Sequence, residues 1–311
     1  ADGTILQVVR FMDGDLTASA VPGLAHLADD RLVENPPAPP ITDLDSLPFP
    51  DVDAIAVAAY RDRLNLVSSR PYFTVQASRG CPFRCGFCFS GNCGYMPYRS
   101  RSPENVLDEL IFLVEKRGVR YVAFQDDVFG FKPGHAEALS EGILARGLRF
   151  GWSVILHPTS FAGRQREVFA LMQRAGLNAV NYGAQSSSPE VLAGIGRSRK
   201  EPEILRESLV AADELGLFSS IEYIFGLPGD TRETMAENIR FACASKATIG
   251  NFHGLQLLEG IPITDRVASG EDVLPDEALV RKMVRQAFVK FYASPQRMMR
   301  LAGLGWRGVM G

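Results

Sequence analysis

Three of the five cysteines in this 311-residue sequence lie within eight positions. Cys81, Cys85 and Cys88 form a Cys-x3-Cys-x2-Cys pattern. Thiolates gathered by one loop are typical ligands of soft metals and of iron–sulfur clusters. Three ligands, rather than four, would leave one metal position open to a molecule that is not part of the protein.

This cysteine pattern admits two kinds of metal site. A closed structural zinc site needs four ligands, and Cys93 could supply the fourth, although zinc sites usually contain two Cys-x2-Cys pairs. A [4Fe–4S] cluster held by three cysteines would instead keep one iron free. Cys243, on a predicted helix, is expected to be a small core residue. Few, odd-numbered and clustered cysteines argue against a disulfide framework and favour a reducing cytoplasm.

The composition is that of a globular protein with a large core. Apolar residues make up 46% and charged residues 22% of the sequence, and the net charge is −3. This balance predicts no general attraction to nucleic acid or to anionic membranes. We expect the substrate to be a small molecule. There is no run of 18 apolar residues and no recognisable signal peptide, although the sequence begins at Ala1 rather than at Met.

Strand-like and helix-like segments alternate from residue 70 onward, and Ser102 before Pro103 and Ser188 before Pro189 predict the starts of two helices. Six such units predict a parallel α/β sheet with right-handed crossovers. Periodicity alone does not separate a partly closed barrel from an open, doubly wound sheet. The predicted strands span residues 72–77, 121–125, 152–156, 179–183, 220–225 and 251–258.

The chemistry-bearing residues follow the predicted strands. In both architectures the active site lies at the carboxyl ends of parallel strands. Five separate loops should therefore bring polar groups to one rim: the cysteine loop, Asp126–Asp127, His157, Gln185–Ser186 and Gly226–Gly229.

The cysteine pattern, with the aromatic Phe87 before its third cysteine, resembles the radical S-adenosylmethionine (radical SAM) superfamily. The resemblance implies a partial (β/α)6 TIM-like barrel over residues 66–265. It implies a [4Fe–4S] cluster on the three cysteines and SAM bound to the open iron through its amino and carboxylate groups. An electron from flavodoxin or ferredoxin would then cleave SAM to a 5′-deoxyadenosyl radical.

The same resemblance assigns SAM contacts at the rim, with Phe87 of the cysteine motif among them. Phe124-Gln-Asp-Asp-Val-Phe129 is similar to a segment near the SAM amino group, which assigns Gln125, Asp126 and Asp127 to this role. Helix capping is the alternative for Asp127. Gln185 and Ser186 correspond to the ribose-binding segment, although a serine-rich capping turn explains the same letters. Residues 224–231 resemble a turn whose members Ile224, Gly226 and Leu227 flank the adenine, or they form a plain strand-to-helix turn.

Two residues stand out as candidate catalytic groups. His157 lies where many relatives carry arginine, and it could reach the SAM carboxylate or act as an acid or base. The alternative is an ordinary histidine at the rim. Glu222 precedes Ile224 by two residues and so shares its face of the strand. We expect Glu222 to have a cationic partner or to touch substrate, because an unpaired charge inside the barrel is costly.

The proline-rich N-terminal part resembles one branch of the superfamily, the cobalamin-binding enzymes. Pro22-Gly-Leu-Ala, Asn35-Pro-Pro and residues 41–51 are typical of that branch. Residues 1–65 are then a linker with a small hairpin that follows a missing cobalamin domain, which leaves cobalamin binding by this chain open. Residues 266–311 form a helical extension that packs on the barrel, with its cations solvated or facing an anionic substrate or a partner domain.

These features lead to three hypotheses about function. The first is a cobalamin-dependent C-methyltransferase of natural-product or cofactor biosynthesis. The second is a 5′-deoxyadenosyl-radical dehydratase, decarboxylase, epimerase or rearrangement enzyme without methyl transfer. The third is a non-enzymatic, zinc-stapled α/β binding module.

Overall fold

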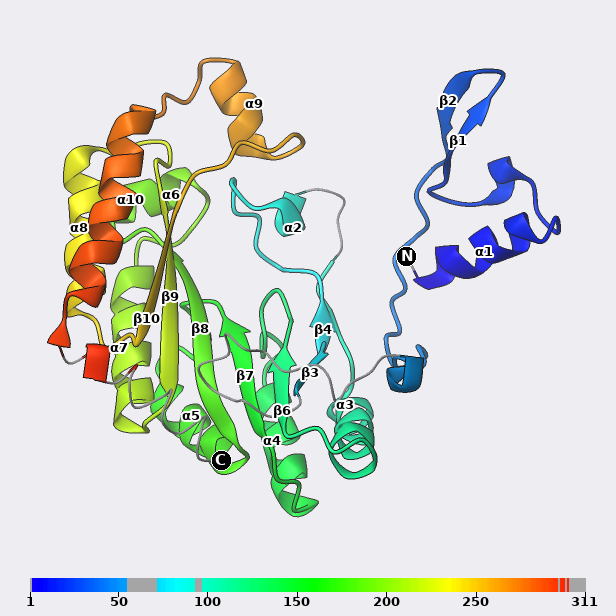
Figure 1. Cartoon of the computed structure of the whole chain (residues 1–311), viewed down its shortest axis with the longest axis horizontal. Coiled ribbons are helices and arrows are strands. Elements are labelled where there is room, and N and C mark those ends of the chain that lie inside the picture. Colours follow the sequence, from blue (N-terminus) through cyan, green and yellow to red (C-terminus); the bar gives the residue numbers. More distant parts are fainter. Residues whose placement is uncertain (1, 55–71, 93–96, 296, 300, 302–311) are drawn as a thin grey trace. The chain divides into compact units, whose positions relative to one another are not determined.

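The computed structural model describes residues 2–54, 72–92, 97–295, 297–299 and 301, which form two compact units (Figure 1). Along the chain, the first unit ends at Leu47 and the second begins at Pro48. The sequence prediction placed domain boundaries at residues 65 and 265. Residue 65 lies outside the described residues, and both boundaries stay predictions.

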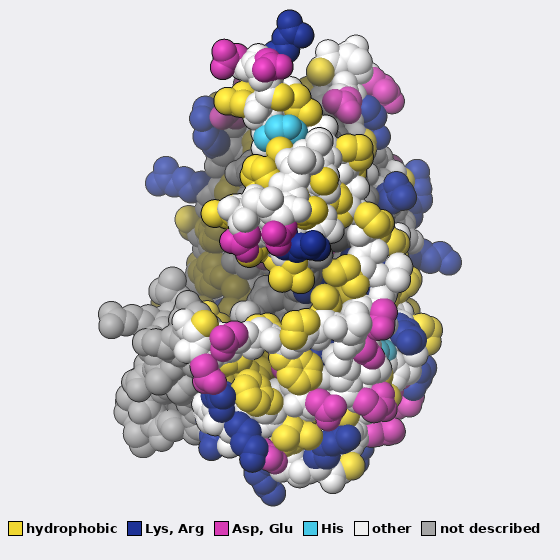
Figure 2. Space-filling model, turned by 90° about the vertical axis from the view of Figure 1, so that its right-hand side faces the viewer, with side chains coloured by type: hydrophobic (Ala, Val, Ile, Leu, Met, Phe, Trp, Pro, Cys, Tyr) yellow, Lys and Arg dark blue, Asp and Glu magenta, His cyan; other side chains and the backbone are white. Residues whose placement is uncertain are grey.

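The N-terminal unit contains a helix and the predicted hairpin. Helix α1 (Asp2–Met12) and a 3-10 turn (Ala18–Ala20) precede the antiparallel strands β1 (Ala25–Ala28) and β2 (Arg31–Glu34). Both turn residues of the hairpin have positive φ, 48° at Asp29 and 59° at Asp30, as a tight two-residue hairpin turn requires. Large apolar side chains remain exposed on α1, and apolar atoms lie among charged ones on the face that Figure 2 shows. On α1 they are Ile5, Leu6, Val9 and Met12.

The second unit is built on a parallel six-stranded sheet. Its strands lie side by side in chain order, β3-β6-β7-β8-β9-β10. A doubly wound sheet would reverse this order at a switch point, so the sequential order confirms the partial barrel. The predicted sixth strand ran to Leu258, which is wrong, because the sheet pairing ends at Gly254 and Leu257 and Leu258 are exposed. The strands are β3 (Tyr72–Val75), β6 (Tyr121–Phe124), β7 (Gly151–Leu156), β8 (Leu177–Gln185), β9 (Phe218–Phe225) and β10 (Ile249–Gly254).

Helices cover one face of this sheet (Figure 1). The first starts as the sequence predicts: the Ser102 side chain accepts a hydrogen bond from the amide of Asn105, with Pro103 at the first helical position. None of the described helices combines the length and apolarity needed to cross a bilayer. The helices are α3 (Pro103–Ile111, continued by a π-turn to Lys116), α4 (His135–Ala145), α5 (Gln165–Arg174), α6 (Pro189–Gly194), α7 (Glu201–Glu214), α8 (Arg232–Ala244), α9 (Pro262–Ala268) and α10 (Glu277–Tyr292).

The C-terminal helix α10 packs on β10 and α8, as its amphipathic pattern predicts. Val280, Met283, Ala287 and Phe291 form its buried face. Beyond the helix, Arg297 donates hydrogen bonds to backbone carbonyls, those of Ala242, Cys243, Ser245 and Ala247 among them. This cation of the basic tail is therefore buried in the fold instead of being solvated or facing a substrate.

The two faces of the sheet differ in chemistry. Residues that point toward the helices form the main apolar core, in which Phe124, Phe129 and Trp152 meet as aromatic pairs. Parallel sheets are usually covered on both faces and are apolar throughout. Here the second face carries polar residues and borders a cavity of about 190 Å³. The sequence thus builds a barrel interior that can receive a polar molecule.

Candidate active site

The cysteine loop follows the first barrel strand. A short ribbon of β4 (Ser78–Arg79) and β5 (Arg99–Ser100) leads into and out of it, and α2 (Phe89–Asn92) closes it. The side-chain amide of Asn92 donates to the carbonyl oxygens of Cys85 and Cys88, at 2.8 and 2.7 Å. The loop thereby satisfies these two backbone carbonyls with its own side chain, and neither bond uses a cysteine thiol.

The loop is anchored to the far side of the barrel. The amide of Gly86 donates to the carbonyl of Ile195 at 2.9 Å, and the amide of Ile263 donates to Gly86 at 3.0 Å. Gly196 has a φ of 77°, and a Cβ there would lie 3.3 Å from the carbonyl oxygen of Arg84. Only glycine suits this close approach without strain. The loop therefore has a fixed position over the strand ends.

Phe87, the aromatic of the motif, packs on a second apolar cluster next to the loop. Ile224 also packs on this cluster, and Leu227 is a fully buried member of it. The structure thus brings together three residues that the sequence placed near SAM. The other members are Val191, Leu192, Ile195, Ile261 and Ile263.

The three thiols lie close enough to influence one another. Burial raises the pKa of Cys85 to about 11; the cation of Arg197 opposes this, and Cys88 and Cys81 add to it. Burial also raises the pKa of Cys81. A cluster ligand must be a thiolate, so the positive iron centre has to supply the stabilisation that burial removes.

The described residues contain no preformed site for a single metal ion. In the described part of the chain, no three His, Cys, Asp or Glu side chains converge to hold one metal ion. A four-iron cluster places each thiolate on a different iron, so its ligands stand farther apart than those of one zinc. Cys93, the possible fourth zinc ligand, lies outside the described residues.

His157 stands directly under the cysteine loop. The ring of Phe83 stacks on it, with centroids 3.8 Å apart and planes 11° apart. Nδ1 lies 2.7 Å from the hydroxyl oxygen and 3.3 Å from the amide nitrogen of Thr159. Because an amide N–H can only donate, we assign Nδ1 as the acceptor and the proton to Nε2. Burial, with a further contribution from Arg197, lowers the pKa of His157 to about 3. The ring is therefore neutral at physiological pH, and its 3.7 Å approach to Glu201 is not an ion pair.

The proton on His157 Nε2 has no hydrogen-bond acceptor among the described residues. An orphaned, buried donor costs free energy unless a bound group satisfies it. Because it lies beside the cysteine loop, a carboxylate or hydroxyl of a bound cofactor could accept this hydrogen bond. The unpartnered Nε2 of His157 is therefore consistent with a ligand bound at the open position of a cluster.

A buried ion pair, Arg197 with Glu201, completes this side of the site. Arg197 Nε donates to Glu201 Oε2 at 2.7 Å, and its Nη2 donates to the carbonyl of Gly183 at 3.0 Å. Both side chains are less than 5% exposed. Sequence reasoning missed both residues, because Arg197 lies in the loop before α7, where the rule for side chains four apart on one helix does not apply.

Asp126 supports the entry to the cysteine loop. Its carboxylate accepts hydrogen bonds from the amide of Ala77 and from the hydroxyl of Ser78. It is 1% exposed, whereas its neighbours Gln125 and Asp127 are exposed. The contact of these three residues with the SAM amino group stays a prediction, and Asp127 is the carboxylate with free access to solvent.

The burial of Asp126 predicts a pH-dependent stability. Burial raises its pKa to about 6, from an ordinary value near 3.8. The folded state therefore holds this proton more tightly, and the free energy of unfolding should fall by on the order of 3 kcal/mol as the pH rises through that window. Urea unfolding of cluster-free protein at pH 4 and pH 7 measures this. In Asp126→Asn most of the fall should disappear; an unchanged pH profile would refute the assignment.

The end of β8 is locally strained at Gln185. This residue has a φ of 63°, and the strand pairing shifts between Gly183 and Gln185. The hydroxyl of Ser186 donates to Asn238 and accepts from the amide of Ser188, so it faces the protein. Ser188 caps α6, as the sequence predicts. Ribose binding by Gln185 and Ser186 stays a prediction, and Gln185 is the more accessible of the two.

The turn after β9 is built by Asp230. Its carboxylate accepts from the amides of Gly226 and Leu227, at 2.9 and 3.1 Å. Gly226 has a φ of 87°, and a Cβ there would come within 2.9 Å of Val280. The plain structural explanation of this glycine therefore holds, and the adenine contact of the turn stays a prediction beside it.

Glu222 lies on the polar face of the sheet and lines the interior cavity. It is exposed, and it forms no ion pair within the part of the chain that the structure describes. We expected Glu222 either to pair with a cation of the protein or to contact substrate. No such cation is found among the described residues, so contact with substrate stays a prediction.

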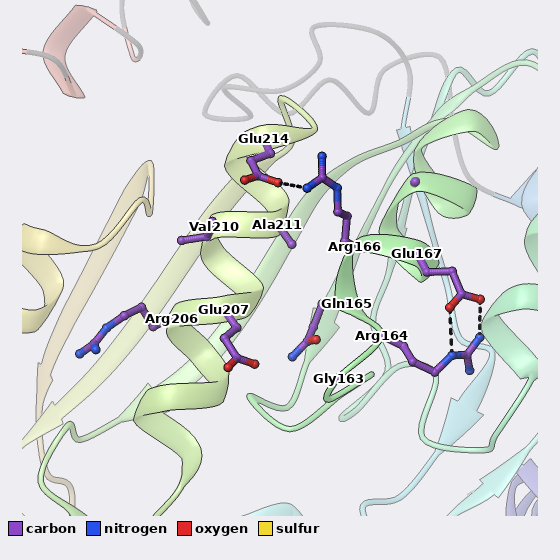
Figure 3. A pocket seen from close by; sticks show the side chains of 11 residues that line it. Gly163, Arg164, Gln165, Arg166, Glu167, Arg206, Glu207, Val210, Ala211 and Glu214 are labelled. Carbon is purple, nitrogen blue, oxygen red and sulfur yellow. Dashed lines mark hydrogen bonds and ion pairs between the residues drawn. The ribbon is translucent and has the colours of Figure 1, made fainter.

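A larger hollow of about 770 Å³ lies elsewhere, between α5 and α7 on the helical layer (Figure 3). Four of its charged side chains form two ion pairs, Arg164 with Glu167 and Arg166 with Glu214. None of the rim residues described above lines it. Its volume alone does not make it the active site.

The fold and the cysteine-centred rim define a class of protein. The radical SAM superfamily model matches residues 75–242, more than half of the chain. The chain belongs to the radical SAM superfamily.

Within this superfamily, the chain is similar to methyltransferases and to a cyclase. An uncharacterized methyltransferase of Pyrococcus horikoshii is 28% identical over 239 residues, covering 77% of this chain and 50% of that protein. The anaerobic magnesium-protoporphyrin IX monomethyl ester cyclase of Cereibacter sphaeroides is 28% identical over 254 residues, covering 80% and 40%. The radical SAM methyltransferase TsrM from Kitasatospora setae, solved with tryptophan substrate and a SAM analogue, superposes with a TM-score of 0.66 at 25% identity, covering 85% and 52%. The chain thus spans about half the length of these relatives or less.

Proposed function

We propose that this chain is the catalytic barrel of a cobalamin-dependent radical SAM methyltransferase that acts on an unactivated carbon of a small molecule. One observation carries the proposal: Cys81, Cys85 and Cys88 lie on a fixed loop over the open, polar interior of the barrel. The likeness to TsrM and to the Pyrococcus methyltransferase supports methyl transfer.

The three cysteines would hold a [4Fe–4S] cluster and leave one iron for SAM. When bound and reduced, the cluster supplies the electron that breaks a carbon–sulfur bond of SAM. Around it, this chain's own groups bind and orient. Arg197 adds positive charge beside the thiolates, and the neutral His157 offers an Nε2 proton to an acceptor. The stacked ring of Phe83 keeps water from one side of His157.

Cobalamin would be bound by a separate domain outside residues 1–311. The proline-rich segment in the N-terminal unit supports this placement, because a stiff connector suits the join between two domains. The electron donor would be a small reductant such as flavodoxin or ferredoxin, and a reducing cytoplasm suits the free thiols.

A second candidate is radical chemistry without methyl transfer. The Cereibacter relative is named a cyclase, so close sequence likeness extends beyond methyltransferases. The same cysteine loop and rim would serve both reactions. What differs is the fate of the methyl group.

Isotope labelling separates the two candidates. The full-length protein is loaded with iron, sulfide and cobalamin, then given a reductant, methyl-deuterated SAM and candidate substrates. Methyl transfer predicts a product that carries the deuterated methyl group. Turnover that yields 5′-deoxyadenosine and an unmethylated product would instead establish the second candidate and overturn the first.

A further inference from the structure

The barrel interior holds an ionisable group that the proposed reaction does not use. The cavity of about 190 Å³ is lined by Phe124, Gln125, Ser153, Ile155, Asn181, Tyr182, Gly183, Ser220, Glu222 and Asn251. Among these lining residues Glu222 is the only acid, and there is no Lys, Arg or His. A space of this size suits one functional group or a small ring.

Two polar neighbours of Glu222 are held by hydrogen bonds, whereas Glu222 is not. The hydroxyl of Ser220 donates to Asn181 Oδ1 at 2.6 Å, and Asn181 Nδ2 donates to the carbonyl of Val154 at 3.2 Å. These two side chains are thus held in place against the sheet, where they line the cavity. Glu222 itself has no ion-pair or hydrogen-bond partner within the described residues.

The strand register gives the carboxylate neutral neighbours on both sides. Glu222 pairs with Gly183 on β8 and with Asn251 on β10. The side-chain amide of Gln185 lies 2.5 Å from the position that a Cβ of Gly183 would take, and the amide of Asn251 can turn to donate or to accept. No described residue that lines the cavity is a cation that could pair with the carboxylate.

Filling this cavity would remove water from the carboxylate. A dehydrated carboxylate without a partner is strongly disfavoured, whereas a charge-assisted hydrogen bond offsets the loss. Because none of the described residues that line the cavity is a cation, the molecule that fills it would supply the positive charge. We propose that Glu222 is a specificity-determining residue, and that the substrate carries a protonated amine, amidine or guanidinium that binds to it.

The register also gives the depth of this contact, and here the inference rests on the proposed function. Glu222 lies two residues before Ile224, which the resemblance to the superfamily places beside the adenine of SAM. Two residues of a strand span roughly 6.6 Å. The cationic group would then bind one strand repeat away from the adenine site, and the carboxylate would orient the substrate relative to SAM.

Small probes test the cation site without knowledge of the substrate. Binding of benzamidine, and of its neutral analogue benzamide, is measured by ligand-observed NMR on cluster-loaded protein. We expect benzamidine to bind at least about tenfold more tightly than benzamide, and Glu222→Gln to remove most of this preference. Glu222→Lys should reverse it, so that benzoate binds better than benzamidine.

A matched control keeps the result specific. Glu237 is exposed on the outer helix α8, and Glu237→Gln removes the same charge there. Its benzamidine affinity should equal that of the wild type. Iron content and circular dichroism confirm that each variant is folded. The inference is overturned if benzamidine shows no preference over benzamide, including no binding of either, or if Glu222→Gln keeps the preference.

The same samples separate this inference from the proposed function. Iron content and cleavage of SAM report on the cysteine loop, while the benzamidine preference reports on Glu222. A cluster-bearing, SAM-cleaving protein without the preference refutes only the cation site. A protein that binds benzamidine through Glu222 but cannot hold the cluster refutes only the proposed function.

Discussion

Replacing Cys85 by alanine should abolish both iron loading and SAM cleavage. Cys85 is the most buried of the three motif thiols, and Gly86 beside it is anchored to Ile195 and Ile263. Neither the backbone nor a neighbouring side chain can move to replace the lost ligand. We expect iron content to fall severalfold and 5′-deoxyadenosine production to fall below detection, measured by metal analysis and by mass spectrometry after reduction.

Cys243→Ala is the matched control for this prediction. Cys243 lies on α8 and packs against the main core, far along the chain from the cysteine loop. Its removal deletes one thiol without touching the proposed cluster ligands, so iron content and SAM cleavage should be retained. Equal iron loss in the two variants would contradict the ligand assignment, as would full SAM cleavage by Cys85→Ala.

Replacing Arg197 by methionine should have the largest effect on stability. Removing one member of a buried ion pair leaves an uncompensated charge, here that of Glu201, and costs about 3–5 kcal/mol. Arg197 also holds the carbonyl of Gly183, so the variant loosens the end of β8. Urea unfolding followed by circular dichroism should show this loss of unfolding free energy, and iron loading should weaken as well.

Two further variants separate the buried charge from general damage. Arg197→Met combined with Glu201→Gln removes both charges and should recover part of the lost stability. Arg199, which pairs with Glu190 at the exposed surface, provides the control: Arg199→Met should cost less than about 1 kcal/mol. An Arg197→Met variant as stable as Arg199→Met would show that the buried pair has no such role.

Local sequence patterns predicted the repeating elements well, for a physical reason. The caps at Ser102 and Ser188 and the hairpin turn at Asp29–Asp30 depend on neighbouring residues alone, so sequence sufficed to place them. The six-strand alternation predicted the parallel sheet, because such units can pack only with short, right-handed crossovers. The last strand was predicted too long, since three leucines among residues 255–258 mimic a buried strand although the strand pairing ends at Gly254.

The site was only partly predictable, because its remaining members depend on contacts between distant segments. The sequence placed the cysteines, Phe87 and His157 at one rim, and the strand order brings them to one edge of the sheet. It did not predict that Arg197 and Glu201 would be buried beside His157, since both letters also suit an exposed helix start. Nor could it show that Asp126 supports the loop entry instead of facing solvent.

Metal analysis of the anaerobically prepared protein tests the central claim most directly. The account predicts about four irons and four acid-labile sulfides for each chain, and loss of both when Cys81, Cys85 and Cys88 are replaced together. One zinc without iron, or iron loading that survives the triple replacement, would contradict it.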